Sequence, residues 1–271
     1  MVATLRAVGL THACLGNHEA DLHWPMLQNR LQELTAKDKV TLVNTNVRKP
    51  PPASKLAGTD GEWMLTKAPP YAIVPSACGR VNIALLGLLS DEPSVFRDHT
   101  FRGAPIGNVI TAYQESYAEI VAGNLADLVV PMTHMSLSRD KELARCMLEL
   151  QPQGVPSVII GGHEHEPYDI KVFDNGEIDA FGIDNNPQDA STSSFAGDDN
   201  NYIRILKSGC DAEAATLIDL TFDVDAEGQP LIDMQADIVS MKPYEPSVVV
   251  QKIVDEKMSV VDTLNNEMIV Q

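Results

Sequence analysis

The chain has 271 residues, 44% of them hydrophobic, which is enough to build the core of one large domain or two smaller ones. Its formal net charge of -18 opposes binding to phosphate backbones and to anionic lipid, because such binding needs a surplus of Lys and Arg. We therefore expect neither a nucleic-acid polymer nor a membrane surface as a partner. An acidic protein that acts on an anionic substrate needs a local cation, and bound divalent metal ions are the usual source.

The sequence lacks the patterns of export and of membrane insertion. No stretch approaches the ~20 apolar residues of a membrane span, and the start, MVATLRAVGL, has no long apolar core of a signal peptide. We therefore expect no transmembrane segment and no signal peptide in this chain, and we leave its compartment open. Four cysteines stand far apart without a C-x-x-C pair, which indicates buried thiols rather than a zinc ribbon or a disulfide framework.

Up to residue 163, short apolar runs alternate with helical patterns, which is typical of an α/β fold. The apolar runs predict buried strands over 11–16, 39–46, 81–89, 126–134 and 155–163. Apolar residues at steps of three and four predict helices over 24–37, 110–125 and 138–150. Ser138 fits the N-cap position of the last of these helices.

The pattern changes after residue 200. The segments NYIRILKSG, ATLIDLTFDVD and PLIDMQADIVSMKP predict an antiparallel meander at one edge of the sheet. Segment 184–201 is rich in Asp, Asn, Ser and Gly, and predicts a mobile, solvated insertion. Segment 246–271 predicts an amphipathic helix whose apolar stripe needs a partner. The stripe consists of Val250, Val254, Met258, Val261, Leu264 and Met268. We therefore divide the chain into a domain over 1–245 and a helix over 246–271.

Potential metal ligands follow three of the expected strands. Asn17 and His18 follow the first strand, His134 ends the fourth, and His163 and His165 follow the fifth. Because the carboxyl ends of strands in an open α/β sheet converge on one crevice, these side chains can meet there. Each histidine alone is more typical of an ordinary structural residue, so the convergence carries the prediction.

The stretch GGHEHEP has a spacing that suits a metal cluster. In an extended chain, residues i and i+2 point to the same side, so His163 and His165 can address one cluster while Glu164 points away. The two preceding glycines allow the backbone to approach closely and to turn.

Two further polar groups have open interpretations. Asn44 and Asn46 would either line the same crevice or form a turn. Lys207 and Ser208 would lie either close to the site or in an ordinary hairpin turn. Residues 139–140 are interpreted as the start of a helix.

Four ordered blocks, LGNHEAD, VVPMTHMSLSRDKELA, IIGGHEHEP and ILKSGCDAEAATLIDL, resemble the calcineurin-like metallophosphoesterases. The resemblance is greatest to the N-terminal catalytic domain of the 5'-nucleotidase family, and it covers roughly residues 5 to 265. It implies a four-layer α/β/β/α sandwich with two metal ions at the strand ends. The activity it implies is hydrolysis of phosphate monoesters, with a small phosphorylated substrate such as a nucleotide.

The resemblance also implies a role for each matching residue. Asn17, His134 and His163 would bind one divalent metal ion, and His165 would help to bind the other. His18 would be the catalytic histidine, and Asp21 would orient it. Ligands of this kind suit zinc, manganese or iron. In such two-metal sites the ions clamp the phosphoryl group and lower the pKa of a bridging water.

The sequence departs from the family pattern at its start. Members of the family carry an Asp-x-His motif and a Gly-Asp motif ahead of Gly-Asn-His, whereas only 15 residues precede Gly16 and the first aspartate is Asp21. We therefore expect a fold that lacks the first two strands and most ligands of the second metal. Three interpretations stay open: an active phosphoesterase, a truncated or degenerate relative that binds one metal or none, and an incomplete gene model. Members of the family are often exported.

Overall fold

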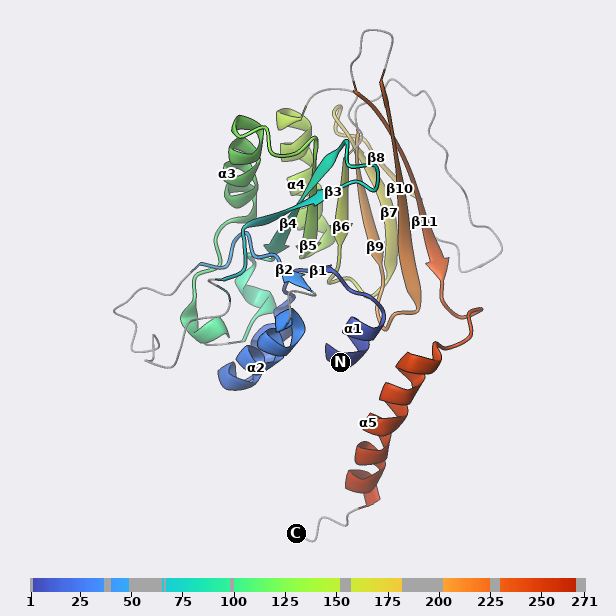
Figure 1. Ribbon diagram of the computed structural model, residues 1–271. Coiled ribbons are helices and arrows are strands. Elements are labelled where there is room, and N and C mark those ends of the chain that lie inside the picture. The colour runs from blue at the N-terminus through green and yellow to red at the C-terminus, as the bar shows by residue number, and fades with distance from the viewer. Residues whose placement is uncertain are drawn as a thin grey trace.

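The computed structural model describes residues 2–36, 40–48, 65, 67–97, 100–151, 157–181, 202–224 and 230–266. A seven-stranded sheet forms its centre (Figure 1). In spatial order its strands are β3 (Tyr71–Pro75), β4 (Asn82–Leu89), β5 (Leu128–His134), β6 (Ser157–Gly161), β9 (Tyr202–Ser208), β7 (Pro167–Phe173) and β8 (Ile178–Phe181). Strands β4, β5, β6 and β9 run parallel, and antiparallel strands flank them on both sides. All four parallel strands therefore point their carboxyl ends to the same edge.

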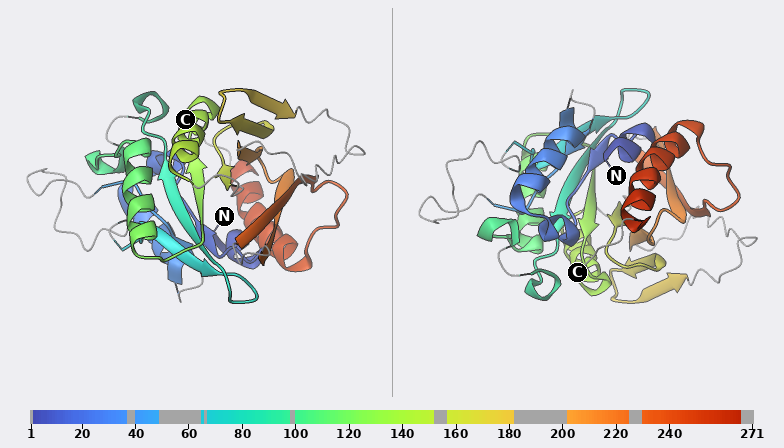
Figure 2. Two further views of the ribbon diagram at one scale, coloured as in Figure 1. Left: turned by 90° about the horizontal axis from the view of Figure 1, so that it is seen from above. Right: turned by 90° about the horizontal axis from the view of Figure 1, so that it is seen from below.

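Two helices cover one face of this sheet. Helix α3 (Val109–Ala122) follows β4, and helix α4 (Leu137–Leu150) follows β5 (Figure 2). Apolar side chains of both helices pack against β4, β5 and β6, and Tyr113, Leu143 and Ile159 are fully buried there. The strands are apolar on both faces because both faces are covered.

The opposite face packs against a second sheet. A hairpin of β10 (Ala214–Val224) and β11 (Pro230–Ser240) forms this sheet. Val130 and Val158 of the central sheet contact the cluster that contains Met234 and Ala236 of β11. Helices, central sheet and hairpin are therefore stacked in layers (Figure 2). The expected α/β fold with two sheets packed face to face is confirmed.

The N-terminal segment lies at the carboxyl edge of the sheet. Its elements are α1 (Val2–Ala7), β1 (His12–Ala13), α2 (Trp24–Thr35) and β2 (Thr41–Leu42). Strands β1 and β2 form a separate two-stranded parallel sheet. The chain after β2 then runs against β4, where the backbone NH of Thr45 donates to the carbonyl of Gly87 at 2.8 Å. Only glycine fits there, because a Cβ at Gly87 would lie 2.2 Å from the Val43 carbonyl oxygen.

Several expectations need correction. Strand β9 was expected in an antiparallel meander at an edge, but it lies inside the central sheet, parallel to β6 and antiparallel to β7. Only the hairpin of β10 and β11 is antiparallel as expected. The first expected strand, 11–16, is shortened to the two residues of β1, because the chain then turns into a 3-10 helix. Helix α4 is capped by Ser136 rather than Ser138, since the Ser136 side chain accepts from the backbone NH of Arg139.

The last helix, α5 (Val248–Asn266), confirms the helix expected over 246–271 within its described part. It contacts α1 (Figure 1). Val254, Met258 and Val261 of the expected apolar stripe are between 37% and 49% exposed, so much of that stripe faces solvent. The insertion expected over 184–201 lies outside the described residues. None of the helices in the described ranges has the length and apolar character needed to cross a membrane.

Candidate functional site

The Gly-Asn-His-Glu stretch forms the short 3-10 helix η1 (Asn17–Asp21), shortly after β1. The backbone NH of Gly16 donates to the Glu19 carboxylate at 2.8 Å, which fixes the start of this turn. The side-chain amide nitrogen of Asn17 donates to the carbonyl of Val95 at 3.2 Å. Val95 belongs to a second short 3-10 helix, η4 (Pro93–Val95), which follows β4. The Asn17 side chain is therefore anchored through its nitrogen, and its oxygen is available on the other side.

That oxygen meets His134, the last residue of β5. The distance from Asn17 Oδ1 to His134 Nε2 is 3.0 Å. The imidazole lies between two glycines, because a Cβ would come 2.9 Å from the ring if placed on Gly16 and 3.0 Å if placed on Gly162. Because neither glycine has a side chain, the two loops that contain them can pack against the His134 ring. The structure thus brings together Asn17 and His134, which are 117 positions apart in the sequence.

The surroundings of His134 keep its ring neutral. Burial, assisted by the nearby charges of His163 and Lys207, lowers the pKa of His134 to about 4. A neutral imidazole is the form that binds a metal ion.

His163 is the third predicted ligand at this place. Its ring centroid lies 5.4 Å from that of His134, and the rings meet edge to face at 76°. The backbone of His163 has a φ of 78°, a left-handed conformation that is uncommon for a residue with a side chain. The Glu164 carboxylate accepts from the backbone NH of Leu137 at 2.6 Å, and the positive φ of His163 departs from the extended geometry expected for this stretch.

His165 is exposed and precedes β7. The hydrogen bond and ring contact described above join Asn17, His134 and His163, and neither involves His165. Its role as a ligand of a second metal stays a prediction.

His18 and Asp21 form a separate pair at the rim. His18 Nδ1 lies 2.9 Å from Asp21 Oδ2, and Arg97 Nε lies 3.2 Å from the other carboxylate oxygen. The hydrogen bond from His18, with the charge of Arg97 adding to it, lowers the pKa of Asp21. With Nδ1 held by Asp21, the imidazole presents its Nε2 atom elsewhere, and its side chain is 75% exposed. This geometry fits a histidine that a carboxylate orients.

The donor atoms at the strand ends are of types that bind divalent metal ions. The amide oxygen of Asn17 and the ring nitrogens of His134 and His163 are ligands that zinc, manganese and iron accept. Within the described ranges, no three His, Cys, Asp or Glu side chains gather closely enough to hold a metal ion. The one cluster on which a metal could be centred therefore depends on the Asn17 amide together with two histidines.

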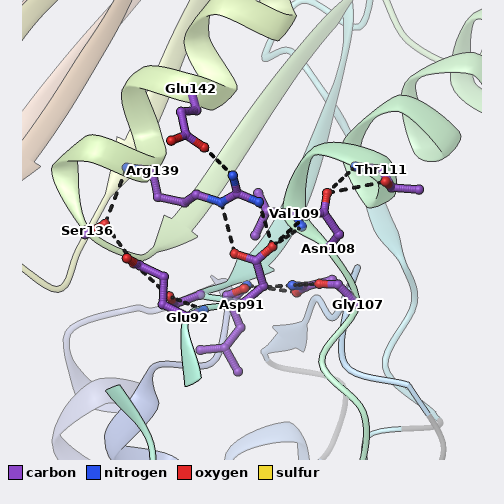
Figure 3. A network of polar contacts seen from close by, with 12 residues as sticks. Asp91, Glu92, Gly107, Asn108, Val109, Thr111, Ser136, Arg139 and Glu142 are labelled. Carbon is purple, nitrogen blue, oxygen red and sulfur yellow. Dashed lines mark hydrogen bonds and ion pairs between the residues drawn. The ribbon is translucent and has the colours of Figure 1, made fainter. Parts of the chain in front are cut away.

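A polar network beside the site was not foreseen (Figure 3). Arg139, in the first turn of α4, donates to both carboxylate oxygens of Asp91, at 3.0 and 2.6 Å. Asp91 follows β4 and also accepts from the backbone NH of Val109 at 3.0 Å. The sequence pattern predicts only a place at the start of a helix for Arg139. A cation is unfavourable in the first turn of a helix, which is a signal that this arginine has a nearby anion.

The two open interpretations are resolved by contacts. The Asn44 side chain binds the backbone of Val47 and Leu65, and the Asn46 side chain binds the backbone of Leu89. Asn44 therefore stabilises a local bend, and Asn46 joins two segments that are distant in the sequence. Lys207 lies close to the predicted ligands, because its ammonium group donates to the carbonyl of Gly162 at 2.8 Å.

No family model matches this chain, and no curated protein sequence matches it. Solved structures do match its fold. Calcineurin-like phosphoesterase YfkN from Bacillus subtilis has a TM-score of 0.62 and 16% sequence identity, over 95% of this chain and 72% of YfkN. NAD nucleotidase NadN from Haemophilus influenzae has a TM-score of 0.62 and 16% identity, over 99% of this chain and 54% of NadN. Sulfate thiohydrolase SoxB from Thermus thermophilus has a TM-score of 0.61 and 16% identity, over 95% of this chain and 38% of SoxB.

This chain therefore spans about half of NadN and less than half of SoxB. At this level of identity the likeness concerns the fold, and proteins of one fold can act on different substrates. The chain has the fold of the calcineurin-like phosphoesterases, as the four sequence blocks predicted.

Proposed function

We propose that this chain is a metal-dependent phosphoesterase domain that hydrolyses small phosphate monoesters such as nucleotides. The observation that carries the proposal is the meeting of Asn17, His134 and His163 at the carboxyl edge of the sheet. The nucleotidase and the calcineurin-like phosphoesterase that share the fold support the substrate class.

In this proposal Asn17, His134 and His163 hold a divalent metal ion, and His165 contributes to a second ion. A metal ion bound there supplies Lewis acidity and a hydroxide nucleophile at neutral pH. The neutral ring of His134 needs no deprotonation to bind. The surplus negative charge of the chain makes a bound cation the natural attraction for an anionic phosphate ester.

His18 is the proposed catalytic histidine. With its Nδ1 atom bound to Asp21, its Nε2 atom can donate a proton to the leaving oxygen of the ester. The Asp21 carboxylate stabilises the protonated imidazole and fixes its orientation. Removing such an acid is expected to lower kcat by about 10²- to 10⁴-fold.

Two measurements test the proposal. The first is the number of Mn²⁺ or Zn²⁺ ions per chain after loading and desalting. The second is phosphate release from AMP and p-nitrophenol release from p-nitrophenyl phosphate, with p-nitrophenol release from bis(p-nitrophenyl) phosphate to separate monoester from diester hydrolysis. Turnover that requires the metal and is lost in His134→Ala and His18→Ala, but kept in the matched control His12→Ala, supports the proposal. His12 suits this purpose because it binds Thr11 at the far end of β1 from Asn17.

Two outcomes would contradict the proposal in different ways. Bound metal without turnover of any ester would show that the domain binds metal but does not catalyse ester hydrolysis. Turnover that survives loss of His134 would place the active site elsewhere.

A further inference from the structure

Lys207 of β9 is fully buried, and its ammonium group has four polar partners. It donates to the carbonyl of Met135 at 2.8 Å and to the carbonyl of Gly162 at 2.8 Å. It also pairs with the carboxylates of Glu164 and Asp140, the latter at 2.7 Å. A fully buried lysine is rare unless it is paired, and here the four partners compensate the buried charge.

The partners of Lys207 flank two of the proposed metal ligands. Met135 directly follows His134. Gly162 precedes His163, and Glu164 follows it. One ammonium group therefore holds the backbone beside both histidines.

The backbone at His163 needs such support. Its φ of 78° is a strained conformation, and strain of this kind persists only where the surroundings hold it. Lys207 binds on both sides of the strained residue, through the Gly162 carbonyl and the Glu164 carboxylate. The other oxygen of Glu164 accepts from the backbone NH of Leu137, which adds the start of α4 to the same support.

The aliphatic part of the lysine side chain is also closely packed. A Cβ at Gly161 would lie 2.9 Å from both Cγ and Cε of Lys207, so the lysine side chain lies directly against the backbone of β6. An arginine has a bulkier, planar head group that this space does not fit.

We propose that Lys207 is a positioning residue that sets the separation and orientation of His134 and His163. The inference rests on the proposed function, because it assigns these two histidines to one metal. It adds a residue that lies outside the predicted ligand set.

The test compares Lys207→Met with Arg204→Met. Arg204 lies on the same strand, is equally buried and pairs with Asp169 at 2.5 Å, and it also donates to the carbonyl of Ala236 in the second sheet. Both variants remove a buried cation: Lys207→Met leaves two carboxylates behind, and Arg204→Met leaves one. Only Lys207→Met removes the support of the histidines.

Mn²⁺ affinity is measured by titration with detection of the free ion, and kcat is measured at saturating Mn²⁺. Lys207→Met is expected to weaken Mn²⁺ binding by about tenfold or more and to lower kcat, since supporting partners of metal ligands contribute at this level. Arg204→Met is expected to keep the wild-type affinity even where its thermal stability falls. Lys207→Arg is expected not to restore binding. Wild-type affinity and kcat in folded Lys207→Met would overturn the proposal.

If Lys207→Met does not fold, the double variant Lys207→Met/Asp140→Asn removes one buried carboxylate that the substitution leaves unpaired. Glu164→Gln is a milder second variant, because this side chain is 22% exposed and glutamine still accepts from Leu137. Weakened Mn²⁺ binding in either variant supports the proposal, and unchanged binding in both overturns it.

Hydrogen exchange at the Leu137 amide separates this inference from the proposed function, because it needs neither metal nor substrate. Faster exchange in Lys207→Met than in Arg204→Met supports the positioning role even if the wild-type chain hydrolyses no ester, an outcome that would refute only the proposed function. Equal exchange in the two variants would overturn the positioning role.

Discussion

The glycine in front of the Asn-His turn offers a clean perturbation of the site. Gly16 has a φ of -108° and an extended backbone, which alanine adopts without strain. The only new feature in Gly16→Ala is therefore a methyl group. Its carbon would lie 2.9 Å from Cε1 of His134 and 3.0 Å from both ring nitrogens.

The size of the effect follows from that distance. An ordinary contact of this kind begins near 3.4 Å, so relief from 2.9 Å requires a shift of about 0.5 Å. The ring cannot move freely, since Gly162 closes its other side. Overpacking of this kind costs about 1–3 kcal/mol of stability. Because a misplacement of about 1 Å can cost about 100-fold in rate, we expect a loss of kcat of about tenfold for half that shift.

The assay is phosphate release at saturating metal, together with Mn²⁺ affinity and thermal unfolding. Gly107→Ala is the matched control, because its Cβ would lie 3.2 Å from the carbonyl oxygen of Asn46, another tight contact outside the ligand cluster. The control should lose stability and keep its activity. If Gly16→Ala keeps both its Mn²⁺ affinity and its kcat while folded, His134 is not part of the metal site.

Three further predictions follow from the polar groups. The folded-state pKa of His134 is about 4 and its unfolded value is 6.5, so the native state loses stability as the pH falls from about 6.5 to 4. In urea unfolding, the loss in free energy of unfolding over this pH range should be about 3 kcal/mol smaller for His134→Gln than for the wild type. Asp21→Asn should lower kcat by about 100-fold with little change in the melting temperature, because its bond to the catalytic histidine is exposed; a KM effect alone would contradict the orienting role. Arg139→Met should lower the free energy of unfolding by about 3 kcal/mol, because it leaves the buried Asp91 carboxylate without its cation, whereas loss of the exposed Arg48 should cost less than about 1 kcal/mol; similar costs would refute this account.

The layered architecture explains why the site residues could be predicted from the sequence. The order of apolar runs and helical periods is a local property, and it determined β4, β5 and β6 together with α2, α3, α4 and α5. Parallel strands connected by helices place their carboxyl ends at one edge, so residues that follow the strands must lie close together. His134 and His163 were therefore predictable as neighbours, whereas Asn17 reaches them from η1, which follows a strand of the separate two-stranded sheet.

Sequence patterns alone failed where the choice depended on distant partners. The segment of β9 reads equally well as an edge strand or as a central one, and only pairing with β6 and β7 decided its place. The helix cap moved to Ser136 because serines at both positions fit the local pattern.

By itself, the sequence determined the α/β class and the place of His134 and His163 at strand ends, because each depends on periodicity or on spacing along the chain. Tertiary structure alone decided that Lys207 is fully buried and that Arg139 is largely buried. Their ionic partners lie on helix α4 and in the loops after β4 and β6. A lysine in an apolar strand has no local signal for such burial. Its energy depends on carboxylates that only the folded chain brings within reach.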